Sequence, residues 1–240
     1  MRPLLLPACV LFFLGSCAAQ APSSRPELRV LFIGNSLTYV NDLPAITVEL
    51  ARADGAVSLE TATVAYPNYS LDDHLIRGEA ARRIAEGGWD VVVLQQGPSA
   101  LPLSRVALIA AAQQFAVLCA AAGARVALYS VWPPSSQPET LDQVTASYAA
   151  AADSIGGLLL PAGWAWHLAW RQDPSLPLYG PDGFHPSPYG SYLAALVIYR
   201  GLTGRSLTGL PDALTIGGVV VNIPPGQAAT MQAAATQVLP

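Results

Sequence analysis

Charged residues are scarce in this chain. Lysine and arginine together number 12, and aspartate and glutamate 16, in 240 residues, which gives a net charge of −4. The sequence contains no basic run and no alternation of aromatic with basic residues, so nucleic acid is not expected as a partner. Hydrophobic residues make up 52% of the chain, which is enough to bury a substantial core and excludes a disordered protein.

Cysteine is scarcer still. Cys9 and Cys17 lie near the N-terminus, so only Cys119 remains for the folded part of the chain. This number excludes a disulfide framework and a Cys-x-x-Cys metal site. A lone cysteine in an Ala/Leu-rich helical stretch is typical of core packing, so we expect Cys119 to be inert.

The N-terminal region lacks an apolar run long enough to span a bilayer. Residues 4–14 form an apolar stretch of about eleven residues after Arg2, which is the length of a signal-peptide core. Leu14-Gly15-Ser16-Cys17 then resembles the bacterial lipobox, in which the cysteine is lipidated and becomes the new N-terminus. The alternative is ordinary cleavage after the Ala-Gln-Ala pattern at 19–21, which is disfavoured because Pro22 would follow the cut.

These features predict an exported protein. Residues 1–21 form the predicted signal peptide and the start of a tether, and residues 22–27, rich in proline and serine, continue the tether. We expect a lipoprotein of the bacterial cell envelope, periplasmic or on the cell surface, that meets the membrane only through a lipid on Cys17. Without lipidation, the protein would be secreted.

Strand-like and helix-like patterns alternate from residue 28 onward. This alternation predicts a parallel sheet with helices on both faces, in one domain that spans residues 28–240. The fold class expected is α/β, with three α/β/α layers and five parallel strands. The predicted strands cover 28–34, 57–65, 89–94, 126–131 and 157–160; the predicted helices cover 43–54, 71–86, 103–122, 140–153, 163–171, 187–201 and 227–238.

The first predicted strand ends in Gly34-Asn35-Ser36, within "LFIGNSLTYV". In open α/β sheets, ligands bind at the carboxyl ends of the strands, which is where Ser36 lies. A serine hydroxyl is a weak nucleophile unless a base, usually histidine, accepts its proton. The chain offers three histidines for this task, His74, His167 and His185.

Position separates the three histidines. His167 sits among tryptophans, which is typical of packing. His74 follows the second strand and is equally compatible with a solvated helix position and with a place in the lining of the site. His185 lies in a Gly/Pro loop just before a helix, with Asp182 three residues earlier, so the carboxylate could fold back to the imidazole and fix its tautomer. The alternative for Asp182 is that it only shapes a turn.

Two motifs together resemble a known family. "IGNSLT" near the N-terminus and "DGFHPS" near the C-terminus resemble the first and last sequence blocks of the SGNH/GDSL hydrolase superfamily, in the same order. The resemblance implies a flavodoxin-like SGNH hydrolase fold. It also implies that Ser36 is the nucleophile, that His185 is the general base and then the general acid, and that Asp182 orients His185.

The family's middle blocks supply an oxyanion hole, and this chain departs from both of them. The backbone N–H of Ser36 is one expected donor. In "VAYPNYSLDDHL", Asn68 stands where the family has glycine, with Tyr69 and Ser70 as alternatives. Asn68 could still donate its backbone N–H, because asparagine tolerates the left-handed conformation better than most residues.

The third block is "DVVVLQQGPSA", where the family has Gly-x-Asn. Counting along the strand puts Ser99 in the place of the asparagine. However, "QGPS" resembles the "QGES" of the carbohydrate-acetylesterase branch, in which a glutamine stands beside the hole. We therefore predict Gln96 as the side-chain donor, with Gln95 as the next candidate. The alternative is that both amides only bond neighbouring loops.

The sequence thus predicts a serine esterase with a Ser-His-Asp triad. The expected substrate is a small ester or an acylated carbohydrate that carries a small acyl group such as acetyl, and no metal or organic cofactor is implied. One alternative is a non-catalytic glycan-binding surface lipoprotein on the same fold. The other is a lipase or thioesterase, which would need an extended apolar groove.

Overall fold

A computed structural model describes residues 26–216 and 219–239. The predicted signal peptide at 1–21 and the lipidation site Cys17 lie outside the described residues, as does the tether up to residue 25. Residues 26 and 27 already join the sheet region, because Glu27 is the first residue of strand β1.

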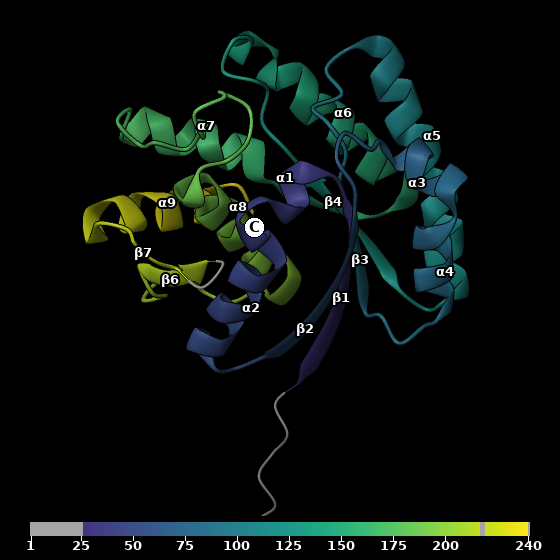
Figure 1. Cartoon of the computed structure of the whole chain (residues 1–240), viewed down its shortest axis with the longest axis horizontal. Coiled ribbons are helices and arrows are strands. Elements are labelled where there is room, and N and C mark those ends of the chain that lie inside the picture. The colour runs from purple at the N-terminus through teal and green to yellow at the C-terminus, as the bar shows by residue number, and fades with distance from the viewer. Residues whose placement is uncertain (1–25, 217–218, 240) are drawn as a thin grey trace, which may run out of the picture.

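Five parallel strands form the central sheet of the molecule (Figure 1). Their order is β2-β1-β3-β4-β5, and every neighbouring pair is parallel, as predicted. The central strands are buried along most of their length, as expected for strands covered on both faces. The strands are β1 (Glu27–Gly34), β2 (Ser58–Ala65), β3 (Val91–Leu94), β4 (Arg125–Ser130) and β5 (Leu158–Pro161).

Helices cover both faces of this sheet, which confirms the predicted three-layer α/β/α arrangement (Figure 1). One side carries α2 (Leu43–Asp54), α7 (Ala162–Gln172), α8 (Pro188–Thr203) and α9 (Pro225–Gln237). The other carries α3 (Leu71–Arg77), α4 (Glu79–Ala85), α5 (Pro102–Ala121) and α6 (Leu141–Ile155). Short helical segments occur at α1 (Ser36–Tyr39), η1 (Val40–Asp42) and η2 (Pro138–Thr140).

Two features of the fold differ from the sequence-based expectation. The helix predicted over 71–86 is two helices, because Gly78 adopts a φ of +75° and its N–H donates to the carbonyl of His74, which ends α3. An antiparallel hairpin, β6 (Ala213–Ile216) with β7 (Val219–Asn222), was not predicted. Its sequence signal is a pair of β-branched runs around Gly217-Gly218.

Helix α5 is the one helix in the described ranges that is long and apolar enough to cross a membrane. Helices in the core of a folded protein often have the same length and composition, so these features alone do not indicate a membrane span. One face of α5 is fully buried and includes Leu108, Phe115 and Cys119. Cys119 is a free, buried cysteine, and burial raises the pKa of its thiol to about 12. The thiol is therefore protonated and unreactive at neutral pH, in line with the predicted packing role.

Candidate active site

Ser36 lies where β1 gives way to the short helix α1. Asn35 caps this helix: its backbone is extended, and its Oδ1 accepts a hydrogen bond from the Leu37 N–H at 3.0 Å. The Asn35 carbonyl then accepts from the Thr38 N–H at 2.9 Å, which closes the first helical turn. The abrupt change from strand to helix holds Ser36 at the carboxyl edge of the sheet, with 7% of the residue exposed.

The turn before Ser36 is held from behind by a buried amide. Gln95 Oε1 accepts hydrogen bonds from the Asn35 N–H at 2.9 Å and from Thr38 Oγ1 at 2.7 Å. Gln95 Nε2 donates to Asn35 Oδ1 at 2.9 Å. A Cβ at Gly34 would lie 2.4 Å from Gln95 Oε1 and 2.3 Å from Thr38 Oγ1, so only glycine fits there. Glycine at 34 is therefore a consequence of this close approach.

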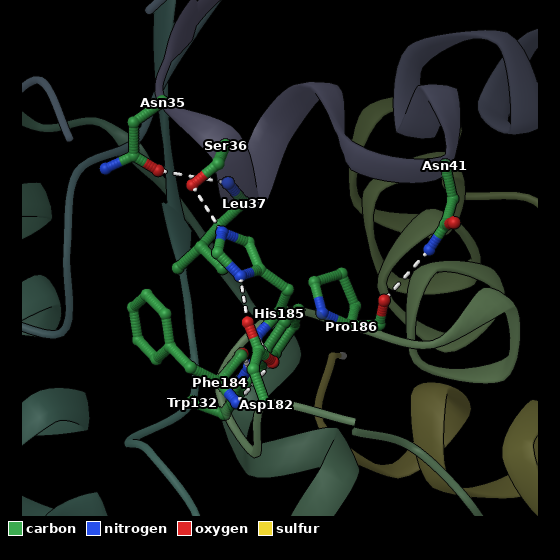
Figure 2. Close-up of polar contacts among 9 residues, drawn as sticks. All are labelled: Asn35, Ser36, Leu37, Asn41, Trp132, Asp182, Phe184, His185 and Pro186. Carbon is green, nitrogen blue, oxygen red and sulfur yellow. Dashed lines mark hydrogen bonds and ion pairs between the residues drawn. The ribbon is translucent and has the colours of Figure 1, made fainter. Parts of the chain in front are cut away.

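His185 lies against Ser36, although 149 residues separate them in the sequence (Figure 2). Its Nε2 is 2.9 Å from Ser36 Oγ, and its Nδ1 is 2.5 Å from Asp182 Oδ2. A carboxylate can only accept, so Nδ1 carries the proton and Nε2 presents a lone pair to the serine hydroxyl. The structure thus brings the three predicted triad residues into one hydrogen-bonded chain.

Asp182 is fixed by its own loop. Its Oδ1 accepts hydrogen bonds from the backbone N–H groups of Phe184 at 3.0 Å and His185 at 2.9 Å. The hydrogen bond to His185 is the main reason that the pKa of Asp182 falls to about 2, and the bond from the Phe184 N–H adds to it. The carboxylate therefore stays ionised at neutral pH and faces the imidazole with a full charge.

The other two histidines lie elsewhere. His74 is completely buried, so it is not the solvated helix residue considered above, and it does not line the pocket beside Ser36. Its Nε2 donates to the Gly34 carbonyl at 2.8 Å, and burial lowers the pKa of its ring, which keeps it neutral. His167 stacks on Trp164 with ring centroids 5.0 Å apart, a packing contact of the kind predicted.

A pocket of about 330 Å³ opens beside Ser36. Its described lining consists of uncharged residues, mostly with hydroxyl, amide or aromatic side chains. They are Asn35, Ser36, Asn68, Tyr69, Ser70, Gln96, Gly97, Pro98, Ser99, Ser104 and Phe184. A larger cavity of about 460 Å³ lies at the opposite edge of the sheet, where β3, β4 and β5 begin. Its lining is almost wholly aliphatic, and Arg125 is the sole ionisable residue among the described ones, so it contains no nucleophile with a base.

Three of the four oxyanion-hole candidates line the pocket, and the fourth does not. Asn68, Gln96 and Ser99 line the pocket, whereas Gln95 lies behind the nucleophile turn with both ends of its amide engaged. Gln96 Oε1 accepts from the Leu71 N–H at 3.0 Å, and its Nε2 donates to Ser99 Oγ at 2.8 Å. Gln95 is thus the weakest of the four candidates.

Backbone donors are also present at this wall. The Ser36 N–H has no hydrogen-bond acceptor among the described residues, which leaves it available to a ligand. Asn68 and Ser99 both adopt the left-handed conformation, with φ of 62° and 59°. Asparagine tolerates this conformation better than most residues, so Asn68 can stand where the family has glycine.

Sequence reasoning did not single out Phe184, which lines the pocket. The available signal was its position directly before His185. Trp132 lies behind Phe184; it is buried and stacks on Trp166 with ring centroids 3.5 Å apart. Trp132 Nε1 donates to the Phe184 carbonyl at 2.9 Å, so it supports the base from behind (Figure 2).

Ser36 after strand β1 and the Asp182/His185 pair before helix α8 define a serine-hydrolase-like site. The parallel sheet with the order 2-1-3-4-5 is that of a flavodoxin-like fold. No family model matches the chain, and no curated protein matches it. Solved structures do match. The chain is similar to a DUF4886 family protein from Bacteroides uniformis, with a TM-score of 0.73 and 20% identity over 88% of this chain and 94% of that one.

Two further solved structures share the fold. A protein from Slackia heliotrinireducens assigned as an SGNH hydrolase has a TM-score of 0.63 and 29% identity, over 73% of this chain and 98% of that one. An acetylxylan esterase from Geobacillus stearothermophilus has a TM-score of 0.57 and 15% identity, over 75% of this chain and 95% of that one. The predicted resemblance is confirmed: the chain has the SGNH hydrolase fold.

Proposed function

We propose that this chain is a serine esterase that removes a small acyl group, acetyl above all, from a carbohydrate. Ser36 Oγ attacks the ester carbonyl while His185 Nε2 takes its proton, and Asp182 stabilises the imidazolium that forms. The imidazolium then returns the proton to the leaving alcohol. A water molecule deprotonated by the same Nε2 hydrolyses the acyl-enzyme and frees Ser36.

One observation carries the proposal. An unbroken hydrogen-bonded chain runs from Ser36 Oγ to His185 Nε2 at 2.9 Å and from His185 Nδ1 to Asp182 Oδ2 at 2.5 Å. A nucleophile, its base and an orienting carboxylate in this order are the requirement for acyl transfer through a covalent intermediate. Ser36, the first residue of this hydrogen-bonded series, lines the pocket, so its activated hydroxyl is accessible to a substrate there.

The negative charge of the tetrahedral intermediate needs donors that are already in place. We propose the Ser36 N–H, the Asn68 N–H and Gln96 Nε2 for this role, since all three residues line the pocket. The Gln96 amide is oriented by the Leu71 N–H, which its Oε1 accepts. One N–H of its Nε2 goes to Ser99 Oγ, which leaves the second one for the oxyanion.

The pocket supports a small acyl group on a polar, uncharged substrate. Its volume of about 330 Å³ is at the lower end for ligand sites. Hydroxyl and amide groups in its lining can bond sugar hydroxyls, and the rings of Tyr69 and Phe184 offer apolar faces. The similarity to acetylxylan esterases of known structure supports the same substrate class.

The decisive experiment is hydrolysis of p-nitrophenyl acetate by the purified domain. We expect turnover that falls at least about 10³-fold in Ser36→Ala. Ser154→Ala, an exposed serine of α6 remote from the pocket, is the matched control and should keep wild-type activity. Wild-type turnover no faster than that of Ser36→Ala would overturn the esterase proposal and favour the non-catalytic glycan-binding protein. Acetate release from acetylated xylooligosaccharides then tests the carbohydrate.

A second candidate, hydrolysis of longer acyl esters, is favoured by one observation. Leu101 and Leu103 are 72% and 85% exposed and come just before Ser104, which lines the pocket. Exposed leucines beside a pocket could hold an acyl chain that extends out of it. This candidate predicts that kcat/KM rises from acetyl to octanoyl esters and that Leu101→Ser with Leu103→Ser abolishes the rise. The acetyl-esterase proposal predicts a decline over the same series.

We also propose that the protein is exported and lipidated on Cys17. The support is the lipobox-like Leu14-Gly15-Ser16-Cys17 after an apolar stretch. Cells expressing the full chain and labelled with radioactive palmitate should yield a labelled protein in the membrane fraction. Cys17→Ala should abolish the label, while Cys9→Ala should not. Label that survives Cys17→Ala would overturn the proposal.

A further inference from the structure

Two consecutive residues that are not glycine adopt the left-handed conformation just after α1. Asn41 has a φ of 57° and Asp42 a φ of 53°. Such backbone is sparsely populated for residues with a Cβ, and it persists where surrounding contacts hold it. It frequently marks sites whose geometry is functional. The pair closes the nucleophile segment, residues 35–42, which starts at the helix cap before Ser36.

The side chain of Asn41 reaches from this segment to the loop that carries the base, residues 180–187, here called the base loop. Asn41 Nδ2 donates to the carbonyl of Pro186 at 3.0 Å (Figure 2). It also donates to Ser191 Oγ at 2.9 Å. Pro186 follows His185 directly, and Ser191 is buried in the first turn of α8. A carbonyl can only accept, so the orientation of the Asn41 amide is determined.

Four consecutive carbonyls of the base loop, from Gly183 to Pro186, each accept a hydrogen bond. The first three donors are the Ser135 N–H at 2.8 Å, Trp132 Nε1 at 2.9 Å and the Gly180 N–H at 2.8 Å, in that order. They belong to the segment after β4 and to the base loop itself. Asn41 supplies the fourth bond, and it does so from the nucleophile segment.

That difference matters for the distance between nucleophile and base. Among the hydrogen bonds of the described residues, two join the nucleophile segment to the base loop: Ser36 to His185, and Asn41 to Pro186. The first is broken whenever Ser36 attacks, because its proton moves to His185. The second survives every step and can keep the two segments in register during the reaction.

We propose that Asn41 is a positioning residue that sets the distance between Ser36 Oγ and His185 Nε2, an inference that rests on the proposed esterase function. Acylation and deacylation both use His185, so a longer distance between His185 Nε2 and Ser36 Oγ slows both steps. The pocket that binds the substrate is unchanged. A displacement of about 1 Å between reacting groups can cost roughly 10²-fold in rate. The effect should therefore fall on kcat and spare KM.

The test is Asn41→Gly in the full chain. Glycine takes a positive φ freely, so the backbone conformation is kept while both hydrogen bonds are lost. We expect kcat for p-nitrophenyl acetate to fall roughly 10–100-fold with KM within about twofold. Asn41→Asp, near in shape and also tolerant of positive φ, replaces the donor with an acceptor and should show the same split if the glycine variant does not fold.

Asp42→Gly is the matched control. Asp42 is the exposed neighbour, is also left-handed, and its side chain makes no hydrogen bond with the described residues, so its kcat should stay near wild type. A fall in Asp42→Gly equal to that in Asn41→Gly would overturn the proposal, because glycine in the segment would then suffice to explain it.

Crystal structures of wild type and Asn41→Gly give a readout that does not depend on catalysis. We expect the distance from Ser36 Oγ to His185 Nε2, 2.9 Å in the wild type, to lengthen beyond hydrogen-bond range in the variant. An unchanged distance would overturn the positioning role even in an active enzyme. If wild-type protein lacks esterase activity, the esterase proposal fails, and the measured distance still decides the role of Asn41.

Discussion

Two walls flank Ser36, and they are built on different supports. The first, the base loop, binds back on itself: Asp182 accepts from the N–H groups of Phe184 and His185, within three residues. The second, called the oxyanion wall after its proposed role, consists of the loops after β2 and β3 that contain Asn68, Gln96 and Ser99. Its central amide, Gln96, is oriented by Leu71, which lies 25 residues away in the sequence.

The difference shows which part of the site is determined locally. Within the base loop, short-range bonds from Asp182 fix the orientation of the His185 ring. Donors distant in the sequence, on Trp132, Ser135 and Asn41, hold three of the loop's carbonyls. The oxyanion wall needs two loops and the start of α3 in register before its donors converge. We therefore expect substitutions in the base loop to act on chemistry alone, and substitutions around the oxyanion wall to act on chemistry or on stability according to the residue.

The largest effect is expected from Asp182→Asn. The amide nitrogen would donate to Nδ1, which forces the proton of the imidazole onto Nε2 and removes the base, so kcat should fall about 10⁴-fold with the fold intact. Steady-state kinetics with p-nitrophenyl acetate and a thermal melt measure both quantities. Asp173→Asn, a loop aspartate bonded to Ser175, is the control and should keep its rate. A loss of less than tenfold in Asp182→Asn would show that the base loop does not act through this carboxylate.

Gln96→Glu probes the oxyanion wall and should have the next largest effect. The carboxylate can still accept the Leu71 N–H, but it has no N–H for the oxyanion and carries charge of the wrong sign. We expect kcat to fall roughly 10²–10³-fold with little change in KM. Ser99→Ala leaves the amide in place and should lose much less. Activity retained in Gln96→Glu would mean that backbone donors alone hold the oxyanion.

The same contrast explains how far sequence reasoning could reach into the site. Ser36 comes two residues after a buried strand, and Asp182 and His185 lie three residues apart, so short motifs identify all three residues of the base side. The oxyanion wall depends on left-handed backbone at Asn68 and Ser99 and on which way two adjacent amides turn. Contacts with distant residues decide those features, and no local pattern encodes them.

The fold divides in a similar way. Runs of apolar residues located the inner strands β1, β3 and β4, because strands buried on both faces read as continuous hydrophobic stretches. The edge strand β2 is only partly buried, but its position was also predicted. The break at Gly78 and the β6–β7 hairpin were missed. An isolated glycine inside a helical pattern ends a helix only if its φ turns positive, and the hairpin packs on α2, far away in the sequence.

Gln95 and Gln96 give the most direct comparison between stability and catalysis. They are adjacent and chemically identical, but Gln95 supports the nucleophile turn and Gln96 lines the pocket. Gln95 is completely buried and accepts from the Asn35 N–H and Thr38 Oγ1 behind the nucleophile turn. Gln95→Leu fills the same space but leaves those donors unpaired. Each buried unsatisfied group costs about 1–3 kcal/mol, so we expect the free energy of unfolding to fall by roughly 3 kcal/mol.

Urea denaturation of Gln95→Leu beside Gln96→Glu separates the two roles. Gln96→Glu keeps its bond to Leu71, so its free energy of unfolding should fall by no more than about 1 kcal/mol. At a temperature where both variants are folded, Gln96→Glu should have lower esterase activity than Gln95→Leu. The opposite ranking, with Gln95→Leu stable and inactive, would transfer the oxyanion role to Gln95. Because the two side chains differ only in the contacts that the fold gives them, this pair measures how much of the site is made by tertiary structure.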